Sequence, residues 1–124
     1  MEDVKSAALT QRIDMAELLS RVDNDLELLG DLIAIFQDDF PRHLHALQRA
    51  VSEKDLHGVK VASHTMKGMM ANLAVSRAAA SAAQLEELAG AGSATALPAA
   101  LAEFEREVDG LLVEMKIRAE EAQR

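Results

Sequence analysis

The chain has 124 residues, 49% of them hydrophobic, and a formal net charge of −8. This length fits a single domain, residues 1–124, with an ordered core expected at about 13–117. The negative charge disfavours nucleic-acid partners, because that binding depends on cationic side chains that displace counterions from phosphates. The absence of cysteine excludes disulfides and thiolate metal sites. With no basic leader and no long apolar run, a cytoplasmic protein without a membrane span is expected.

The first predicted helix begins after Asp14. Asp14 is placed as its N-cap, and Glu17 three residues later gives a start that is similar to a capping box. The helix is expected to be short and to end near Arg21. Residues 1 to about 11 show no periodicity and are expected to be a frayed lead-in.

A long second helix follows a second capping pattern, with Asn24 as the expected cap and Glu27 three residues on. Its apolar residues recur at intervals of three and four, which is typical of a helix with one buried face: Leu29, Ile33, Phe36, Phe40, Leu44, Leu47 and Val51. Pro41 lies inside this stripe and lacks a backbone donor. Because the stripe continues in phase beyond it, a kink near Asp39 is predicted rather than a break.

The third helix is expected from a turn at 52–55 to Asn72 or Leu73, and it carries one histidine away from its apolar side. That side holds Val59, Ala62, Met66, Met69, Met70 and Leu73. His64 points the opposite way. Beside it on the outer face lie Lys60, Lys67, Gly68 and Ala71.

Gly68 is the unusual member of this face, since glycine in a helix interior costs about 1 kcal/mol relative to alanine. Close approach of another molecule explains it, and Ala71 adds only a methyl group. Lys67 would supply positive charge to an anion at the ring. Each feature alone has a simpler explanation: a solvated histidine, an ordinary polar face, or a glycine that eases packing. Together they favour an accessible, reactive imidazole, although composition does not say which reaction it performs.

Two further helices complete the chain. Ser76 is the expected cap of an alanine-rich helix at about 77–89, which Gly90-Ala91-Gly92-Ser93 ends. Pro98 suits the first turn of the last helix, whose seam is Leu97, Leu101, Phe104, Val108, Leu111 and Met115. The charged tail beyond Ile117 is expected to extend into solvent. The predicted fold is therefore all-α, an antiparallel four-helix bundle with a short additional N-terminal helix.

The segment around the histidine resembles the signature of histidine-containing phosphotransfer (HPt) domains. The resemblance rests on His64-Thr65-Met66-Lys67-Gly68 followed by Ala71-Asn72-Leu73. It extends to 13–19, which resembles the opening helix of the family, to 32–36 and 40–44 in the long second helix, and to 84–89 in the fourth. Met69 and Met70 depart from the family pattern, which commonly has small residues at these two positions.

The resemblance implies a phosphocarrier in a multistep two-component phosphorelay. His64 would accept a phosphoryl group from the aspartyl phosphate of a receiver domain and pass it on. Lys67, and with it Lys60, would offset the phosphoryl charge. Glu86 matches a position where the family often places a polar side chain near the ring, so it could orient the imidazole through Nδ1 or lie solvated on the surface. In the opening helix, Met15 and Leu18 would serve core packing or partner docking.

The same resemblance implies how the protein works with others. A response-regulator receiver domain or a hybrid sensor histidine kinase is the expected partner, and Mg²⁺ is expected in the receiver rather than in this chain, which needs no cofactor of its own. A monomer is expected. The chain would act as a carrier rather than as an enzyme with its own turnover.

Three alternatives can be compared with this interpretation. A metal site lacks convergent ligands, because His43 and His45 point to different sides of one helix and His57 lies two turns from His64. An ATP-dependent kinase lacks a glycine-rich phosphate loop followed by lysine. A helical-bundle adaptor that binds a signalling partner without phosphate remains open, and replacement of His64 would distinguish it from a carrier.

Overall fold

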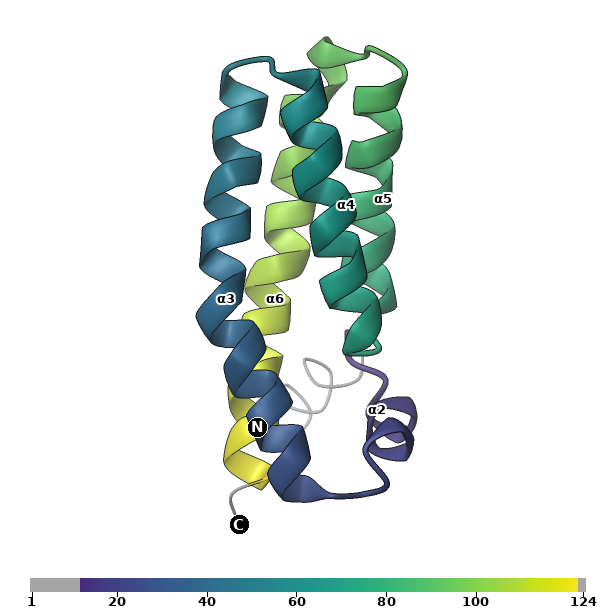
Figure 1. Cartoon of the computed structure of the whole chain (residues 1–124), viewed down its shortest axis with the longest axis vertical. Helices are drawn as coiled ribbons and strands as arrows, with labels where there is room; N and C mark the ends of the chain where they lie inside the picture. Colours follow the sequence, from purple (N-terminus) through teal and green to yellow (C-terminus); the bar gives the residue numbers. More distant parts are fainter. Residues whose placement is uncertain (1–11, 123–124) are drawn as a thin grey trace.

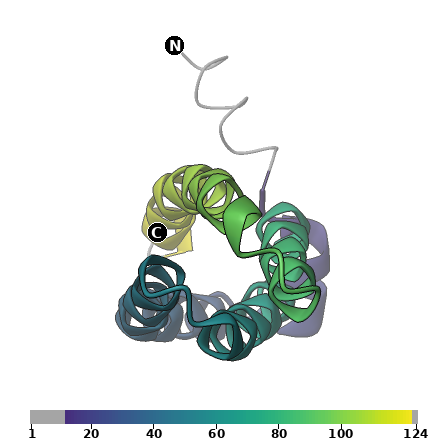
Figure 2. The ribbon, with the colours of Figure 1, turned by 90° about the horizontal axis from the view of Figure 1, so that it is seen from above.

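The computed structural model describes residues 12–122 and confirms an all-α bundle (Figure 1). A short helix precedes four long helices that run alternately up and down, and a 3₁₀ turn, η1, joins the last two. The elements are α2 (Met15–Arg21), α3 (Leu26–Ser52), α4 (Leu56–Asn72), α5 (Ser76–Gly90), η1 (Ala94–Ala96) and α6 (Leu97–Ala122). Seen from above, the four long helices surround a common axis (Figure 2). Residues 1–11, for which a frayed lead-in is predicted, lie outside the described residues.

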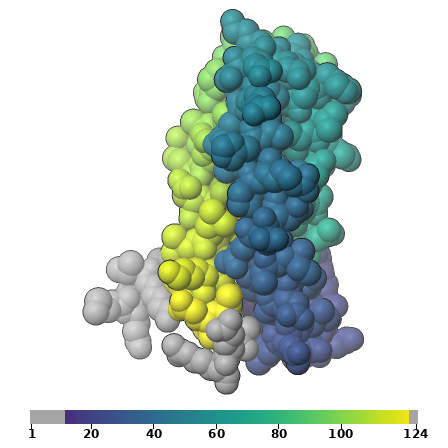
Figure 3. All heavy atoms as spheres, turned by 60° about the vertical axis from the view of Figure 1, so that its left-hand side comes forward, coloured from purple at the N-terminus to yellow at the C-terminus, as the bar shows by residue number. Residues whose placement is uncertain are grey.

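The bundle encloses one apolar core drawn from every helix. Its largest fully buried side chains include Phe40, Phe104, Leu18, Ile33, Met66, Met70, Leu85 and Leu111. The predicted stripes supply most of it, while Leu44, Leu101 and Met69 are only partly buried. Figure 3 shows α3 and α6 packed side by side along the molecule, and Gln48 Nε2 donates to Glu105 Oε2 across this contact at 2.7 Å.

Helix α3 runs without interruption through Pro41. Its lower and upper halves lean in different directions (Figure 1), as expected for a helix that loses one backbone hydrogen bond near its middle. The predicted cap is wrong by one residue: Asp25, not Asn24, accepts from the Leu28 amide at 3.1 Å. Asn24 instead has a positive φ of 60° in the turn after α2, so its backbone cannot start a helix.

Two boundaries near the end of the chain also differ from the prediction. Val75, not Ser76, is the N-cap of α5, because the helix starts directly after it; the Val75 side chain is completely buried and makes no capping hydrogen bond. The tail beyond Ile117 does not simply extend into solvent. Helix α6 continues to Ala122, and Ile117, Arg118 and Ala119 are half-buried. Within residues 12–122, none of the helices is both long and apolar enough to cross a bilayer.

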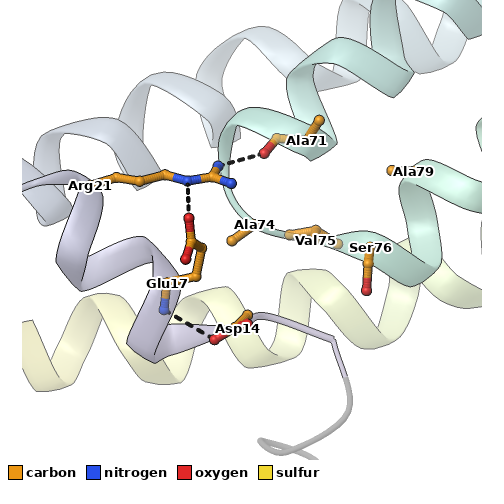
Figure 4. Close-up of a pocket in the computed structure, with 8 residues that line it drawn as sticks. All are labelled: Asp14, Glu17, Arg21, Ala71, Ala74, Val75, Ser76 and Ala79. Carbon is orange, nitrogen blue, oxygen red and sulfur yellow. Dashed lines mark hydrogen bonds and ion pairs between the residues drawn. The ribbon is translucent and has the colours of Figure 1, made fainter.

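Helix α2 lies at one end of the bundle, beside the C-terminal end of α4 (Figure 1). Asp14 caps it by accepting from the Glu17 amide at 3.0 Å, as predicted. The reciprocal half of a capping box is missing, because Glu17 pairs with Arg21 and the Asp14 amide donates to the Ala74 carbonyl at 3.0 Å. The Arg21 guanidinium donates to the Ala71 carbonyl at 2.7 Å (Figure 4). Helix α2 is thus attached to the helix that carries the histidine.

Candidate functional site

His64 lies on the outer face of α4, which Asp55 caps through the Gly58 amide at 2.9 Å. Buried residues before and after His64 in the helix fix this orientation, because they turn the opposite face of α4 to the core. Ser63 and Met66 are completely buried, and the Ser63 hydroxyl donates to the Val59 carbonyl at 2.6 Å. The His64 side chain is 69% exposed as a result. The imidazole ring is therefore carried by a helix with one face packed in the core, and it is accessible to a partner.

A carboxylate on the neighbouring helix joins His64 and Lys67, two of the three basic groups on this face. Glu86 of α5 lies 2.7 Å from His64 Nδ1 through Oε2 and 2.7 Å from Lys67 Nζ through Oε1. Only 20% of its side chain is exposed, against 36% for Lys67. Of the two positions that the sequence leaves open for Glu86, the structure shows the one against the ring. Lys67 does not point freely to solvent but is paired with this carboxylate.

The hydrogen bond from Lys67 is the main cause that lowers the pKa of Glu86, and the hydrogen bond from His64 adds to it, against a rise from partial burial. A carboxyl group with a lowered pKa stabilises the folded state above its ordinary pKa, and this stabilisation is lost as the pH falls through the lowered value. The bridge is therefore intact at neutral pH, where Glu86 is an acceptor only. It follows that His64 Nδ1 carries a proton and donates it to Glu86.

The lowered pKa of Glu86 can be measured directly. In a carboxyl-resolved NMR titration, Glu86 should titrate below about 4.3, the ordinary value for glutamate. Lys67→Ala should raise its pKa more than His64→Gln does, because the lysine hydrogen bond is the larger cause. A Glu86 pKa that is equal in wild type and Lys67→Ala would show that the bridge does not form in solution.

With Nδ1 occupied, the chemistry of His64 is left to the other ring nitrogen. A neutral imidazole that is protonated on Nδ1 has its lone pair on Nε2. Glu86 also offsets positive charge on the ring if Nε2 forms a new bond. The arrangement therefore orients a nucleophile toward solvent without any buried base.

The other predicted residues of this face differ in what surrounds them. A side chain at Gly68 would meet nothing within 4 Å, so the glycine leaves open space next to the ring. Ala71 is exposed, and its carbonyl binds Arg21. Lys60 is exposed and forms no ion pair among residues 12–122, and the structure does not bring it to the Glu86 bridge.

A groove between α3 and α4 was not predicted from the sequence. It encloses about 190 Å³ and is lined by Leu32, Ile35, Phe36, Asp39, Met69, Asn72 and Leu73. Gly68 is exposed and lies between the groove and His64 by helical position, and Asn72 is exposed at the edge of the groove. The only sequence signal for it was Met69, a large residue where the resemblance leads one to expect a small one. Met70, in contrast, is completely buried in the core.

The remaining histidines do not form a metal centre. His43 Nε2 lies 3.2 Å from Asp39 Oδ2, and His45 and His57 are exposed. Within the described part of the chain, no three histidine, aspartate or glutamate side chains are grouped so that they could hold an ion.

The comparisons with known proteins agree with this geometry. The model of the Hpt domain matches residues 31–114, which include α4 and the whole Glu86 bridge. The chain belongs to the Hpt domain family. Among solved structures, it is similar to histidine-containing phosphotransfer protein B (HptB) from Pseudomonas aeruginosa PAO1, with 25% sequence identity, a TM-score of 0.79, and coverage of 93% of this chain and 97% of that one. No curated protein sequence matches the chain significantly.

Membership of the Hpt domain family establishes a histidine phosphotransfer role in phosphorelays. Proteins of this family work with receiver domains and kinases, and the family fits a carrier rather than an enzyme. The fold expected from the resemblance is also confirmed, since the match covers nearly the full length of both chains.

Proposed function

We propose that this chain accepts a phosphoryl group on Nε2 of His64 from the aspartyl phosphate of one receiver domain and donates it to the aspartate of another. The observation that carries the proposal is the exposed imidazole whose Nδ1 is held by Glu86 at 2.7 Å, with Lys67 on the same carboxylate. The direction of transfer then depends on which receiver is phosphorylated. The chain would meet its partners as a cytoplasmic monomer.

The transfer step balances without a base or a cofactor from this chain. The Nε2 lone pair forms the new bond to phosphorus while the bond from phosphorus to the aspartyl oxygen breaks, and the aspartate leaves as a carboxylate. The proton stays on Nδ1, so the phosphorylated ring is cationic and Glu86 faces that charge. Mg²⁺ in the acidic pocket of the receiver would offset the charge on the phosphoryl oxygens. The reverse step returns the same groups.

Lys67 has a secondary part in this proposal. The phosphoryl group adds negative charge next to a lysine that already pairs with Glu86, so its ammonium can be shared between the two. At a half-exposed site such a contact contributes about 1 kcal/mol or less. Lys60, further along the exposed face, would act only through longer-range attraction.

The α3–α4 groove is the proposed docking position of the receiver. Ile35 lines the groove and is 63% exposed, so it offers an apolar contact to a partner. Asp31 and Asp38 lie four and three residues from Ile35 and therefore on the same face of α3, whereas Asp39 is already paired with Arg42 at 2.7 Å. An apolar centre with an acidic rim is complementary to an apolar surface surrounded by basic residues.

Replacing Ile35 by serine should weaken binding of the cognate receiver about fivefold, because an exposed apolar contact is lost while the core is untouched. Val113→Ser is the matched control. Val113 is similarly exposed, but it lies on α6, which does not line the groove. Isothermal titration calorimetry with a receiver measures both. Equal losses for the two variants would place the receiver elsewhere.

The proposed function is tested by mixing the unmodified chain with phosphorylated receiver domains and measuring its intact mass. An adduct that is labile in acid and stable in alkali identifies a phosphorylated histidine, and loss of label from the receiver shows the transfer. Incubation with ATP alone should give no adduct. If a receiver binds tightly but no adduct forms with any receiver tried, the adaptor function takes the place of the carrier.

A further inference from the structure

Arg12 and Ile13, directly before Asp14 and α2, lie against α6. The Arg12 guanidinium forms an ion pair with Glu107 Oε1 at 3.7 Å, and the other oxygen of Glu107 accepts from Arg77 at 2.7 Å. The Ile13 amide lies 3.4 Å from Glu114 Oε1, and the Ile13 side chain is buried. Arg12 and Ile13 are thus attached to α6, and the Asp14 amide is attached to the Ala74 carbonyl.

Gly110 allows this crossing. A Cβ atom at Gly110 would collide with the Arg12 guanidinium, whose nearest atoms are Cζ, Nε and Nη2. Gly110 lies between Glu107 and Glu114 on the same face of α6, three residues after the one and four before the other. Gly30, in the interior of α3, has no atom within 4 Å of the same position. Of these two glycines, only Gly110 leaves the space that an arginine side chain occupies.

Glu114 is the unexplained part of this contact. Glu114 is 0% exposed, and its Oε2 atom has no hydrogen-bond partner. A buried carboxylate with a free oxygen is costly, because the ionised form loses its hydration. An uncharged side chain at this position would stabilise the contact without that desolvation cost. The carboxylate makes the stability of the contact depend on its protonation.

We propose that residues 12–14 form a latch that closes over Gly110 and Glu114 of α6 and holds α2 beside the C-terminal end of α4. When the latch is closed, Asp14 is fixed by Ala74, and Arg21 reaches the carbonyls of Ala71 and Asn72. When it opens, Glu114 gains access to water and α2 keeps only its own contacts with the bundle.

The pH dependence of the latch follows from the burial of Glu114. Burial raises the pKa of its carboxyl group, and the amides of Ile13 and Arg12 together with the charges of Arg118 and Arg12 lower it by less. In the open latch the carboxyl group returns toward its ordinary pKa. The closed form is therefore fully favoured below the ordinary pKa, and it loses stability as the pH rises toward the raised pKa. Over that interval the opening constant increases by up to about tenfold per pH unit.

Hydrogen exchange of the Ile13 and Asp14 amides tests the latch in the full, unphosphorylated chain, so the result does not depend on the proposed function. After division by the intrinsic exchange rate, their protection in wild type should fall as the pH rises above the ordinary carboxyl range. In Glu114→Gln the protection should be independent of pH. Glu120→Gln, an exposed glutamate on the same helix, should behave as wild type. Protection that is flat in wild type, or that falls equally in Glu114→Gln, overturns the proposal.

Gly110→Ala gives a second test that does not rely on titration. Its methyl group should displace Arg12 and lower the protection of Ile13 and Asp14 about fivefold, as expected for loss of a half-buried ion pair. The interior amides of α6 should be as protected or more so, because alanine favours the helix. Gly30→Ala is the matched control and should leave Ile13 and Asp14 unchanged. Equal protection of these two amides in all three proteins contradicts the latch.

Discussion

Replacing His64 by glutamine should abolish the acid-labile phosphoryl adduct, to below detection by intact mass. The lone pair of the glutamine amide nitrogen is delocalised into the carbonyl group. The glutamine side chain therefore cannot replace Nε2 of His64 as the nucleophile that attacks phosphorus. Its NH₂ group can still donate to Glu86 in place of Nδ1, which keeps the bridge to Lys67 and the surface of α4 close to wild type. Loss of the adduct in this variant would therefore be due to the missing nucleophile and not to a change in the fold.

His57→Gln is the matched control, because His57 is exposed on the same helix two turns earlier. This variant should form the adduct at the wild-type rate. Binding of the unphosphorylated receiver should survive in both variants, since the ring is only part of the contact surface. An adduct that persists in His64→Gln would place the acceptor elsewhere and contradict the assignment.

Replacing Glu86 by alanine should slow transfer about a hundredfold. Glu86 fixes the proton on Nδ1 and the direction of the ring, and a displaced or wrongly protonated nucleophile can cost a factor of this size. It also faces the positive charge that the ring gains on phosphorylation. Stopped transfer reactions with a phosphorylated receiver give the rate, and the ¹⁵N chemical shifts of the His64 ring give the tautomer.

Two companion variants separate the parts of this effect. Glu86→Gln keeps an oxygen that accepts from Nδ1 but removes the charge, so a smaller loss of about tenfold is expected. Glu87→Ala removes an exposed glutamate from the same helix and should not change the rate. If Glu86→Ala transfers as fast as Glu87→Ala, or if the ring tautomer is the same in both, Glu86 does not position the histidine.

Much of the fold was predictable because helix periodicity is a local property of the sequence. The four-three spacing placed Ile33, Phe40, Phe104 and Leu111 in the core and left His64 outside it. The Asp14 cap was found for the same reason, since its partner is three residues away. The family motif then gave the phosphotransfer role, which the match to residues 31–114 confirms.

The errors occurred where two neighbouring residues fit the same local pattern. Asn24 and Asp25 are both good caps, and the turn after α2 decides between them by giving Asn24 a positive φ. Serine is the better cap by residue type, but α5 begins at Ser76, so the buried Val75 stands at the N-cap position. For Leu18 the sequence left core packing and partner docking open, and its nearly complete burial shows core packing, whereas Met15 is half-buried.

The sequence by itself determined the helices, their buried faces and the exposed position of His64, because each depends on residues within one or two turns. Only the tertiary structure decided what surrounds that histidine and what holds α2 in place. Glu86 is 22 residues from His64, Arg21 is 50 residues from Ala71, and Glu114 is 101 residues from Ile13. Such pairs meet only when neighbouring helices have a definite rotation and axial register, and these are set by the packing of the entire core.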